Sequence, residues 1–183
     1  MTTISNDATA EHLYPVLQSD TAEFVNGLLF LISPNGRTPS RAAGNIYYKL
    51  VQYERRTKIG YAIPDKTGFV VDLPNRKSFT PDAAFYLGKL TKSCLQGAPI
   101  FAVEVRSEGD YGPTAEQEMA SRRADYFAAG TQIIWDVDLL SDDVVRVYRA
   151  CDPNTPTIYR RGERAEAEPA LAGWTMRVDD LFV

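Results

Sequence analysis

The chain has 183 residues, of which 44% are hydrophobic and 24% are charged, an ordinary globular composition that excludes wholesale disorder. This length fits a single domain with a sizeable hydrophobic core. A net charge of −4 and a pI near 5.1 argue against a generally basic nucleic-acid coat protein, although a local basic groove would still permit DNA binding.

Signals for export or membrane insertion are missing from the sequence. The start, MTTISNDATAEH, lacks the basic and apolar regions of a signal peptide, and no apolar run reaches about 18 residues. Cys94 and Cys151 have neither paired nor metal-ligand spacing, which favours a reducing compartment. We therefore expect a soluble, cytoplasmic protein that does not enter a membrane. His12 is the only histidine and lies in a polar segment, so histidine-based nucleophilic or zinc chemistry is not expected.

The first third of the chain predicts a hairpin and a helix. Residues 1–20 are polar and aperiodic, and we expect a flexible lead-in to one domain that covers residues 21–183. Asn26-Gly27 separates two apolar segments, which is the strongest short signal for a β-hairpin. From about Ser40 to Glu54 apolar residues recur at helical spacing and predict an amphipathic helix.

Short strands, a second helix and two more strands follow. KIGYAI, TGFVVDL, TPDAAFYL and, most clearly, APIFAVEVRS predict strands. A helix is expected to begin at about Pro113, because proline suits the first turn, and to end at Gly130. TQIIWDVD and VVRVYRA predict two further strands, and the apolar tail GWTMRVDDLFV is expected to pack on the body. This order predicts one mixed α/β domain.

Charged residues interrupt two of the predicted strands. Asp82 heads the run AAFYL, and Glu104 and Arg106 stand within FAVEVR. Because residues two apart share a face of a strand, Glu104 and Arg106 project together, opposite the valines that flank Glu104. Buried charges are costly unless they are paired or bound to metal, so the pattern indicates either an internal ion pair or a site.

Two carboxylates would meet if the strands of Asp82 and Glu104 are neighbours. They would repel each other unless a proton or a hard cation lay between them. Mg²⁺ prefers oxygen ligands, and one such cation could span carboxyl groups about 3–6 Å apart. The competing interpretation is a structural ion pair between Glu104 and Arg106 on a half-buried sheet, with Asp82 in a simple turn.

The second predicted helix carries two adjacent arginines. A helical projection places Arg122 within the apolar arc that includes Tyr126, and Asp125 on the polar strip. We assign Arg123 to a structural pair with Glu116 on the same helix. Arg122 has no local partner and is the better candidate to point at the carboxylates, with extension towards water as the alternative.

Two basic stretches are candidates for contact with a DNA backbone. Arg55, Arg56 and Lys58 follow the first helix, where the helix dipole also favours a solvated positive charge. The sequence YRRGER, residues 159–164, predicts a charged surface hairpin. Binding of phosphates needs such a patch somewhere, so both interpretations stay open.

Five segments together resemble a known family. In order, SPNG, PDAAF, FAVEVRSEGDYGP, YFAAG and IIWDVD resemble the Uma-type family of bacterial restriction-endonuclease-like proteins, within the PD-(D/E)XK nuclease superfamily. The resemblance runs from about Phe24 to Val183 and is most specific between Phe79 and Asp138. It implies a mixed sheet flanked by helices, with a metal-dependent phosphodiesterase site.

The resemblance also implies roles for individual residues. The superfamily binds its metal through two acids and the backbone carbonyl after the second acid, and these positions fall on Asp82, Glu104 and Val105, with Mg²⁺ or Mn²⁺ as the cofactor. The superfamily's lysine falls on Arg106, and the helix lysine of family members falls on Arg122. Both are departures. Because arginine effectively cannot lose its proton, either side chain could orient a water or stabilise phosphate charge, but neither could act as a general base.

The sequence therefore predicts a Mg²⁺-dependent DNA endonuclease. Symmetric cutting of a duplex would suit a homodimer. One alternative is a non-catalytic nucleic-acid-binding or protein-binding module that keeps the nuclease fold without the catalytic lysine. Another is an interaction protein whose buried ion pairs are purely structural.

Overall fold

A mixed six-stranded sheet forms the centre of the computed structural model, which describes residues 22–31 and 36–183. The strand order is β11-β10-β9-β8-β6-β3. β8 and β9 are parallel, and the other neighbouring pairs are antiparallel. The mixed sheet confirms the predicted α/β class, whereas the expected lead-in over residues 1–20 lies outside the described residues.

Short strands and two long helices make up the described chain. The central sheet contains β3 (Tyr61–Pro64), β6 (Ala83–Tyr86), β8 (Phe101–Val105), β9 (Ile133–Val137), β10 (Val145–Arg149) and β11 (Asp152–Tyr159). The smaller sheets contain β1 (Ala22–Val25) with β2 (Leu28–Leu31), β4 (Phe69–Val70) with β5 (Ser78–Phe79) and β7 (Leu95–Gln96), and β12 (Arg164–Glu166) with β13 (Thr175–Arg177). The helices are α2 (Arg37–Thr57), α3 (Pro113–Ala128) and the 3₁₀ helix η1 (Val178–Phe182).

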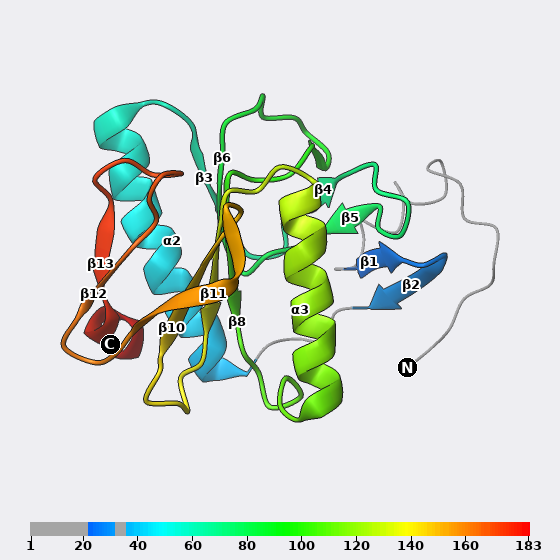
Figure 1. Ribbon diagram of the computed structural model, residues 1–183. Helices are drawn as coiled ribbons and strands as arrows, with labels where there is room; N and C mark the ends of the chain where they lie inside the picture. The colour runs from blue at the N-terminus through cyan, green and yellow to red at the C-terminus, as the bar shows by residue number, and fades with distance from the viewer. Residues whose placement is uncertain (1–21, 32–35) are drawn as a thin grey trace.

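Helices cover both faces of the central sheet. Alternate residues of β8 enter different cores, because successive side chains of a strand point to opposite faces. Phe101, Val103 and Val105 join the core beneath α2, whereas Ala102 joins the core that contains Tyr126 of α3. Figure 1 shows α2 and the β12–β13 hairpin on one side of the sheet, and α3 with β4 and β5 on the other. Glu104 therefore lies on the α3 face, as its position between two valines predicts.

The first predicted helix is confirmed and is longer than expected. Its buried residues recur every three or four positions: Ala42, Ala43, Ile46, Leu50 and Tyr53. The helix begins at Arg37 and includes Pro39 in its first turn. Proline is tolerated there because the N–H groups of a first turn have no helical acceptor, so the missing N–H costs no hydrogen bond. The helix ends at Thr57, and the capping residue Lys58 adopts a left-handed conformation (φ 57°).

The predicted hairpin at Asn26-Gly27 is also confirmed. Both turn residues have positive φ, 51° and 77°, as the tight turn between antiparallel strands requires. The hairpin docks against the segment before β5, where the Asn26 N–H donates to the Asn75 carbonyl (2.7 Å) and the Lys77 N–H donates to the Phe24 carbonyl (3.0 Å). This docking brings the hairpin to the α3 side of the molecule.

The C-terminal segment seals the opposite face. Trp174 is 3% exposed and packs against the rings of Phe101 and Trp135, with ring centroids 5.6 and 5.1 Å apart. The predicted packing of the tail is thus confirmed. The predicted hairpin within residues 159–164 is wrong: these residues lead from β11 of the central sheet to β12, which pairs with β13. Within the described ranges, no helix combines the length and apolarity needed to cross a membrane.

Candidate active site

Asp82 forms hydrogen bonds with the backbone of the two residues that flank Glu104. Its N–H donates to the Val103 carbonyl (3.0 Å), and its Oδ2 accepts from the Val105 N–H (2.7 Å). Asp82 directly precedes β6, whose residue Ala83 pairs with Val103 of β8. The predicted neighbourhood of the two acid-bearing strands is therefore confirmed, and Asp82 is buried at their junction.

Glu104 is held on the α3 face by two donors from one helix. Its Oε1 accepts from Arg122 Nε (3.0 Å) and from the Tyr126 hydroxyl (2.7 Å). Burial raises the pKa of Glu104 to about 7; Arg122 opposes this rise, and the neighbouring carboxylates Asp82 and Glu23 add to it. The pKa of the Tyr126 hydroxyl is raised well above its usual value, mainly by burial, so the hydroxyl stays a donor.

Arg122 links Glu104 to the N-terminal hairpin. Its Nη1 donates to Glu23 Oε2, and its Nη2 donates to the Thr80 carbonyl (3.3 Å). Glu23 in turn accepts from the Thr80 N–H (2.7 Å), so one carboxylate holds both Arg122 and the backbone two residues before Asp82. Arg122 therefore points at the carboxylates, as the helical projection favours, and does not simply extend towards water.

A second arginine completes this network. Arg76 Nη1 donates to Glu23 Oε2 (2.8 Å), and Arg76 Nε donates to Asp125 Oδ2 (2.7 Å). The helical projection places Asp125 on the polar strip of α3, yet Asp125 is 7% exposed and also accepts from Asn75 Nδ2 (2.8 Å). The reason is non-local: residues before β5 supply the charge partner that the helix itself lacks.

The network is acidic. It joins two guanidinium groups to three carboxylates: Arg76 and Arg122 to Glu23, Glu104 and Asp125. If all were ionised, one negative charge would remain, and the Asp82 carboxylate adds to the repulsion at Glu104. Such an excess in a buried site favours either a proton on Glu104 or a bound cation.

Arg106 does not pair with Glu104, and this part of the predicted geometry is wrong. Its Nε and Nη2 donate to Asp136 Oδ1 and Oδ2 (both 2.8 Å), and it also binds Glu116 through two nitrogens. Asp136 lies opposite Glu104 in the register of β9 with β8, so it offers a second acid on the same face. Two parallel hydrogen bonds from one guanidinium group to one carboxylate make Asp136 a stronger partner for Arg106 than Glu104 would be.

The expected pair between Arg123 and Glu116 is also wrong. Glu116 binds Arg106, and Arg123 Nη1 lies 3.6 Å from Asp136 Oδ2 with its guanidinium 4.1 Å from the centre of the Tyr148 ring. Arg123 nevertheless has partners within the protein, in line with its structural assignment. The two adjacent arginines of α3 thus serve two different acids, Glu104 and Asp136.

Sequence reasoning missed three residues of this region. Asp136 interrupts the apolar run IIWDVD in the same way as Glu104 interrupts its own strand, so the same argument would have found it. Glu23 and Arg76 carry no comparable local signal, because their pairing depends on how the hairpin docks. The basic stretch at Arg55 and Arg56 lies elsewhere, at the end of α2, which covers the other face.

Oxygen atoms are the donors available for a metal. Within residues 22–31 and 36–183, no group of three or more His, Cys, Asp or Glu side chains has the arrangement of a metal site. The expected set of Asp82, Glu104 and the Val105 carbonyl contains two carboxylates and one backbone oxygen. That composition suits Mg²⁺, which commonly binds through one or two carboxylates and retains waters or phosphate oxygens.

The fold and the position of the acids define a class of protein. A mixed sheet with a helix on either face, and an acid before one strand beside an acid within its neighbour, are the features of a restriction-endonuclease-like fold. The chain belongs to the Uma2 family, described as "Putative restriction endonuclease", whose model matches residues 10–179.

A solved structure supports the assignment of the fold. The chain is similar to a crystal structure described as a putative nuclease belonging to DUF820 from Anabaena variabilis, with a TM-score of 0.70 and 16% sequence identity. The match covers 88% of this chain and 89% of that one. A comparison with curated proteins found no match.

Proposed function

We propose that the protein is a Mg²⁺-dependent endonuclease that hydrolyses phosphodiester bonds of DNA. One observation carries the proposal: the Asp82 carboxylate accepts the N–H of Val105, directly beside Glu104, in a chain of the Uma2 family. This contact brings the Asp82 carboxylate to the backbone next to Glu104, close enough for the charge of Asp82 to raise the pKa of Glu104. The surrounding excess of carboxylates favours a cation at that point.

Asp82, Glu104 and the Val105 carbonyl would hold Mg²⁺ or Mn²⁺. When bound, the metal would lower the pKa of a water molecule and offset negative charge on the phosphate. Asp82 is positioned for this by its bond to the Val105 N–H, and Glu104 by Arg122 and Tyr126. A group fixed in this way needs little reorganisation when charge develops during the reaction.

Arg122 would stabilise charge on the reacting phosphate. Its guanidinium lies between Glu104 and Glu23, which fix its direction, and these carboxylates keep its pKa raised although burial acts against the charge. It therefore stays charged and cannot accept a proton. Arg106 is already bound by Asp136 and Glu116. We therefore expect its positive charge to act near the reacting phosphate without contacting that phosphate directly.

A second candidate is a DNA-binding module without catalytic activity. The observation that favours it is the presence of arginine at both positions where the superfamily and family would have lysine, Arg106 and Arg122. Such a module would bind DNA without cutting it. The two candidates therefore differ in a single assay.

Cleavage of supercoiled plasmid with Mg²⁺, with Mn²⁺ and with a chelator tests the proposal. We expect nicked and linear products with either metal, none with the chelator, and a loss of at least about 100-fold for Asp82→Asn and Glu104→Gln. Glu108→Gln, a change at an exposed glutamate near the site, serves as the matched control and should cut like the parent. Metal-independent cutting would overturn the proposal, and DNA binding without any cutting would favour the second candidate.

A further inference from the structure

A second cluster of charged side chains lies beside the candidate active site on the same face of the sheet. Arg106 follows β8, Asp136 belongs to β9, Arg146 belongs to β10, and Glu116 and Arg123 belong to α3. Arg106 is the centre of the cluster, since its side chain is 4% exposed and binds both Asp136 and Glu116.

Two guanidinium nitrogens of this cluster have unmade hydrogen bonds. In the described part of the chain, Arg123 Nη1 and Arg146 Nη1 are buried and have no hydrogen-bond partner. Each forms a longer ion-pair contact instead: Arg123 Nη1 lies 3.6 Å from Asp136 Oδ2, and Arg146 Nη1 lies 3.7 Å from Asp138 Oδ2. Burial of a donor without an acceptor is unfavourable, so these atoms favour a further acceptor at this place.

Glu116 already places one acceptor there. Its side chain is 51% exposed, unlike that of Arg106 beneath it. Its pKa is lowered, first by the hydrogen bond from Arg106 and then also by the charges of Arg146 and Arg123. Three arginines therefore act on one exposed carboxylate. An ion pair with an exposed partner contributes little to stability, so an external anion could replace Glu116 at small cost.

The charge of the cluster fits a phosphodiester. Without Glu116, three guanidinium groups face the two buried carboxylates Asp136 and Asp138, which leaves one positive charge. A phosphodiester carries one negative charge, as does the Glu116 carboxylate that now occupies the position. The planar forks of arginine also match the paired oxygens of a phosphate.

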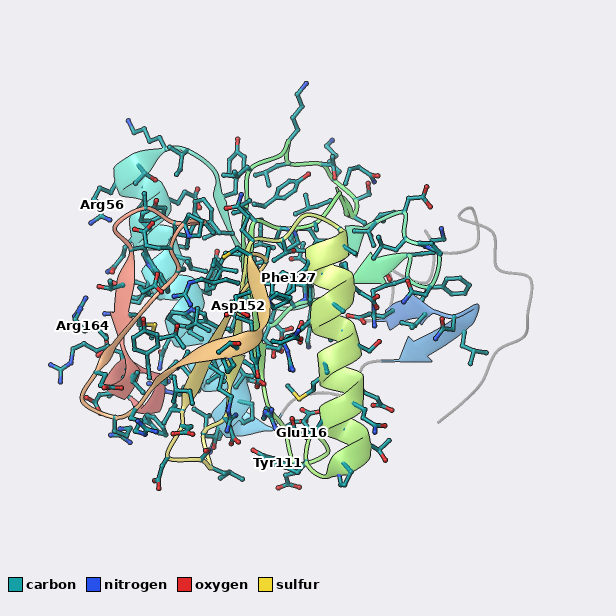
Figure 2. All side chains as sticks on the ribbon, in the orientation of Figure 1. Arg56, Tyr111, Glu116, Phe127, Asp152 and Arg164 are labelled. Carbon is teal, nitrogen blue, oxygen red and sulfur yellow. The ribbon has the colours of Figure 1, made fainter. Side chains whose placement is uncertain are left out.

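The cluster is about one nucleotide away from the two acids. Asp136 pairs with Glu104 across adjacent strands, which lie about 4.8 Å apart, and Arg106 is two residues beyond Glu104, about 7 Å along the strand. Figure 2 shows Glu116 and Tyr111 at the N-terminal end of α3. The Tyr111 hydroxyl donates to Asp138 Oδ1 (2.9 Å), the carboxylate that also faces Arg146.

We propose that Arg106, Arg123 and Arg146 form a phosphate-binding subsite for a backbone phosphate next to the scissile one, and that Glu116 is its internal occupant in the free protein. The identity of the ligand as nucleic acid rests on the proposed function, whereas the anion site itself does not. Bound DNA displaces the Glu116 carboxylate from Arg106 and supplies acceptors to Arg123 and Arg146. Glu116 therefore weakens DNA binding in the parent protein.

Glu116→Gln tests this role in the full chain. Binding of a 20-base-pair duplex is measured by fluorescence anisotropy with Ca²⁺ in place of Mg²⁺, over a series of salt concentrations. We expect Glu116→Gln to bind about threefold or more tightly than the parent, and its plot of log affinity against log salt to be steeper by about one phosphate contact. Glu118→Gln removes the same charge from another exposed position of α3 and should change neither quantity to this extent.

A double variant and a second probe define the remaining outcomes. Arg146→Gln in the Glu116→Gln background should abolish the gain. Inorganic phosphate should raise the melting temperature of Glu116→Gln more than that of the parent; a gain with phosphate but not with the duplex would support the anion site and overturn DNA as its ligand. Equal gains for Glu116→Gln and Glu118→Gln, or no gain for either, would overturn the subsite. Tighter binding without plasmid cleavage would retain the subsite and refute the endonuclease.

Discussion

The Glu104 carboxyl group is the residue-scale feature on which the candidate active site depends, because burial shifts its pKa towards neutral pH. Burial raises its pKa to about 7, while Arg122 and Tyr126 stabilise the ionised form. Its charge is therefore close to balance near neutral pH, where a proton and a cation would compete for it. Asp82 lies beside it, with its Oδ2 accepting the backbone N–H of Val105.

The first prediction concerns stability against pH. Because the folded-state pKa of Glu104 lies above the ordinary value of 4.5, the folded protein holds this proton more tightly than the unfolded chain. The resulting stabilisation is complete below pH 4.5 and is lost as the pH rises through about 7. The free energy of unfolding of Glu104→Gln, relative to the parent, should therefore increase by on the order of 2 kcal/mol between pH 5 and pH 8 without divalent metal. Urea denaturation at both pH values measures it, and a constant difference would refute the raised pKa.

The second prediction concerns Arg122. Arg122→Lys keeps a positive charge and adds a group that can lose its proton, so cleavage should be preserved or increased. Arg122→Ala should lower cleavage by about 100-fold while metal binding remains. Arg55→Ala, at an exposed position of α2 on the other face, is the control and should cut like the parent. Single-turnover kinetics on supercoiled plasmid at fixed Mg²⁺ provide the measurement; if Arg122→Ala cuts at the parent rate, the arginine is structural.

At the scale of single residues, the sequence predicts which positions are unusual better than it predicts their partners. An acid within an apolar strand indicates a site because burial of a charge is costly, and this reasoning located Glu104 on the correct face. It paired Arg106 with Glu104 because they share a strand face, yet the neighbouring strand brings Asp136 closer in the right orientation. Partners on other elements depend on the register of the sheet, which no local pattern specifies.

At the scale of elements, the local sequence likewise predicts most helices and strands but not how they dock on one another. The hairpin, both long helices and the strands β8, β9 and β10 follow from turn residues and periodicity. β5, β7 and the eight-residue β11 are not among the predicted strands, because none of the three shows an apolar alternation in the sequence. The sequence predicts the hairpin but not its docking, which delivers Glu23 to Arg122, because these two residues are 99 positions apart in the chain.

The third prediction concerns the C-terminal segment. Trp174 anchors it to the sheet through Phe101 and Trp135, so Trp174→Ala should lower the free energy of unfolding by about 3–5 kcal/mol. Leu140→Ala removes an 81% exposed side chain and should change it by at most about 0.5 kcal/mol. Urea denaturation compares the two. A loss below about 1 kcal/mol for Trp174→Ala would mean that the segment does not seal the core.

At the scale of the whole molecule, the two faces of the sheet differ in their role. The α2 face holds the larger apolar core, closed by the C-terminal segment, whereas the α3 face carries the buried ion pairs. In Figure 2, Arg56 and Arg164 lie on the side away from Glu116. One residue of each basic stretch, Arg56 of α2 and Arg164 of β12, thus lies on the side of the sheet opposite α3. Under the proposed function, DNA would approach from the α3 side, where arginines are paired with acids in the free protein.

The most direct test of the account is a calorimetric titration of Mn²⁺ into the metal-free protein. We predict one site per chain in the parent, no specific binding in Asp82→Ala or Glu104→Ala, and unchanged binding in Glu108→Gln. Circular dichroism must show that both alanine variants remain folded, as expected if removal of one carboxylate relieves repulsion. Binding of Mn²⁺ to the folded alanine variants with parental affinity would contradict the account, as would absence of binding in the parent.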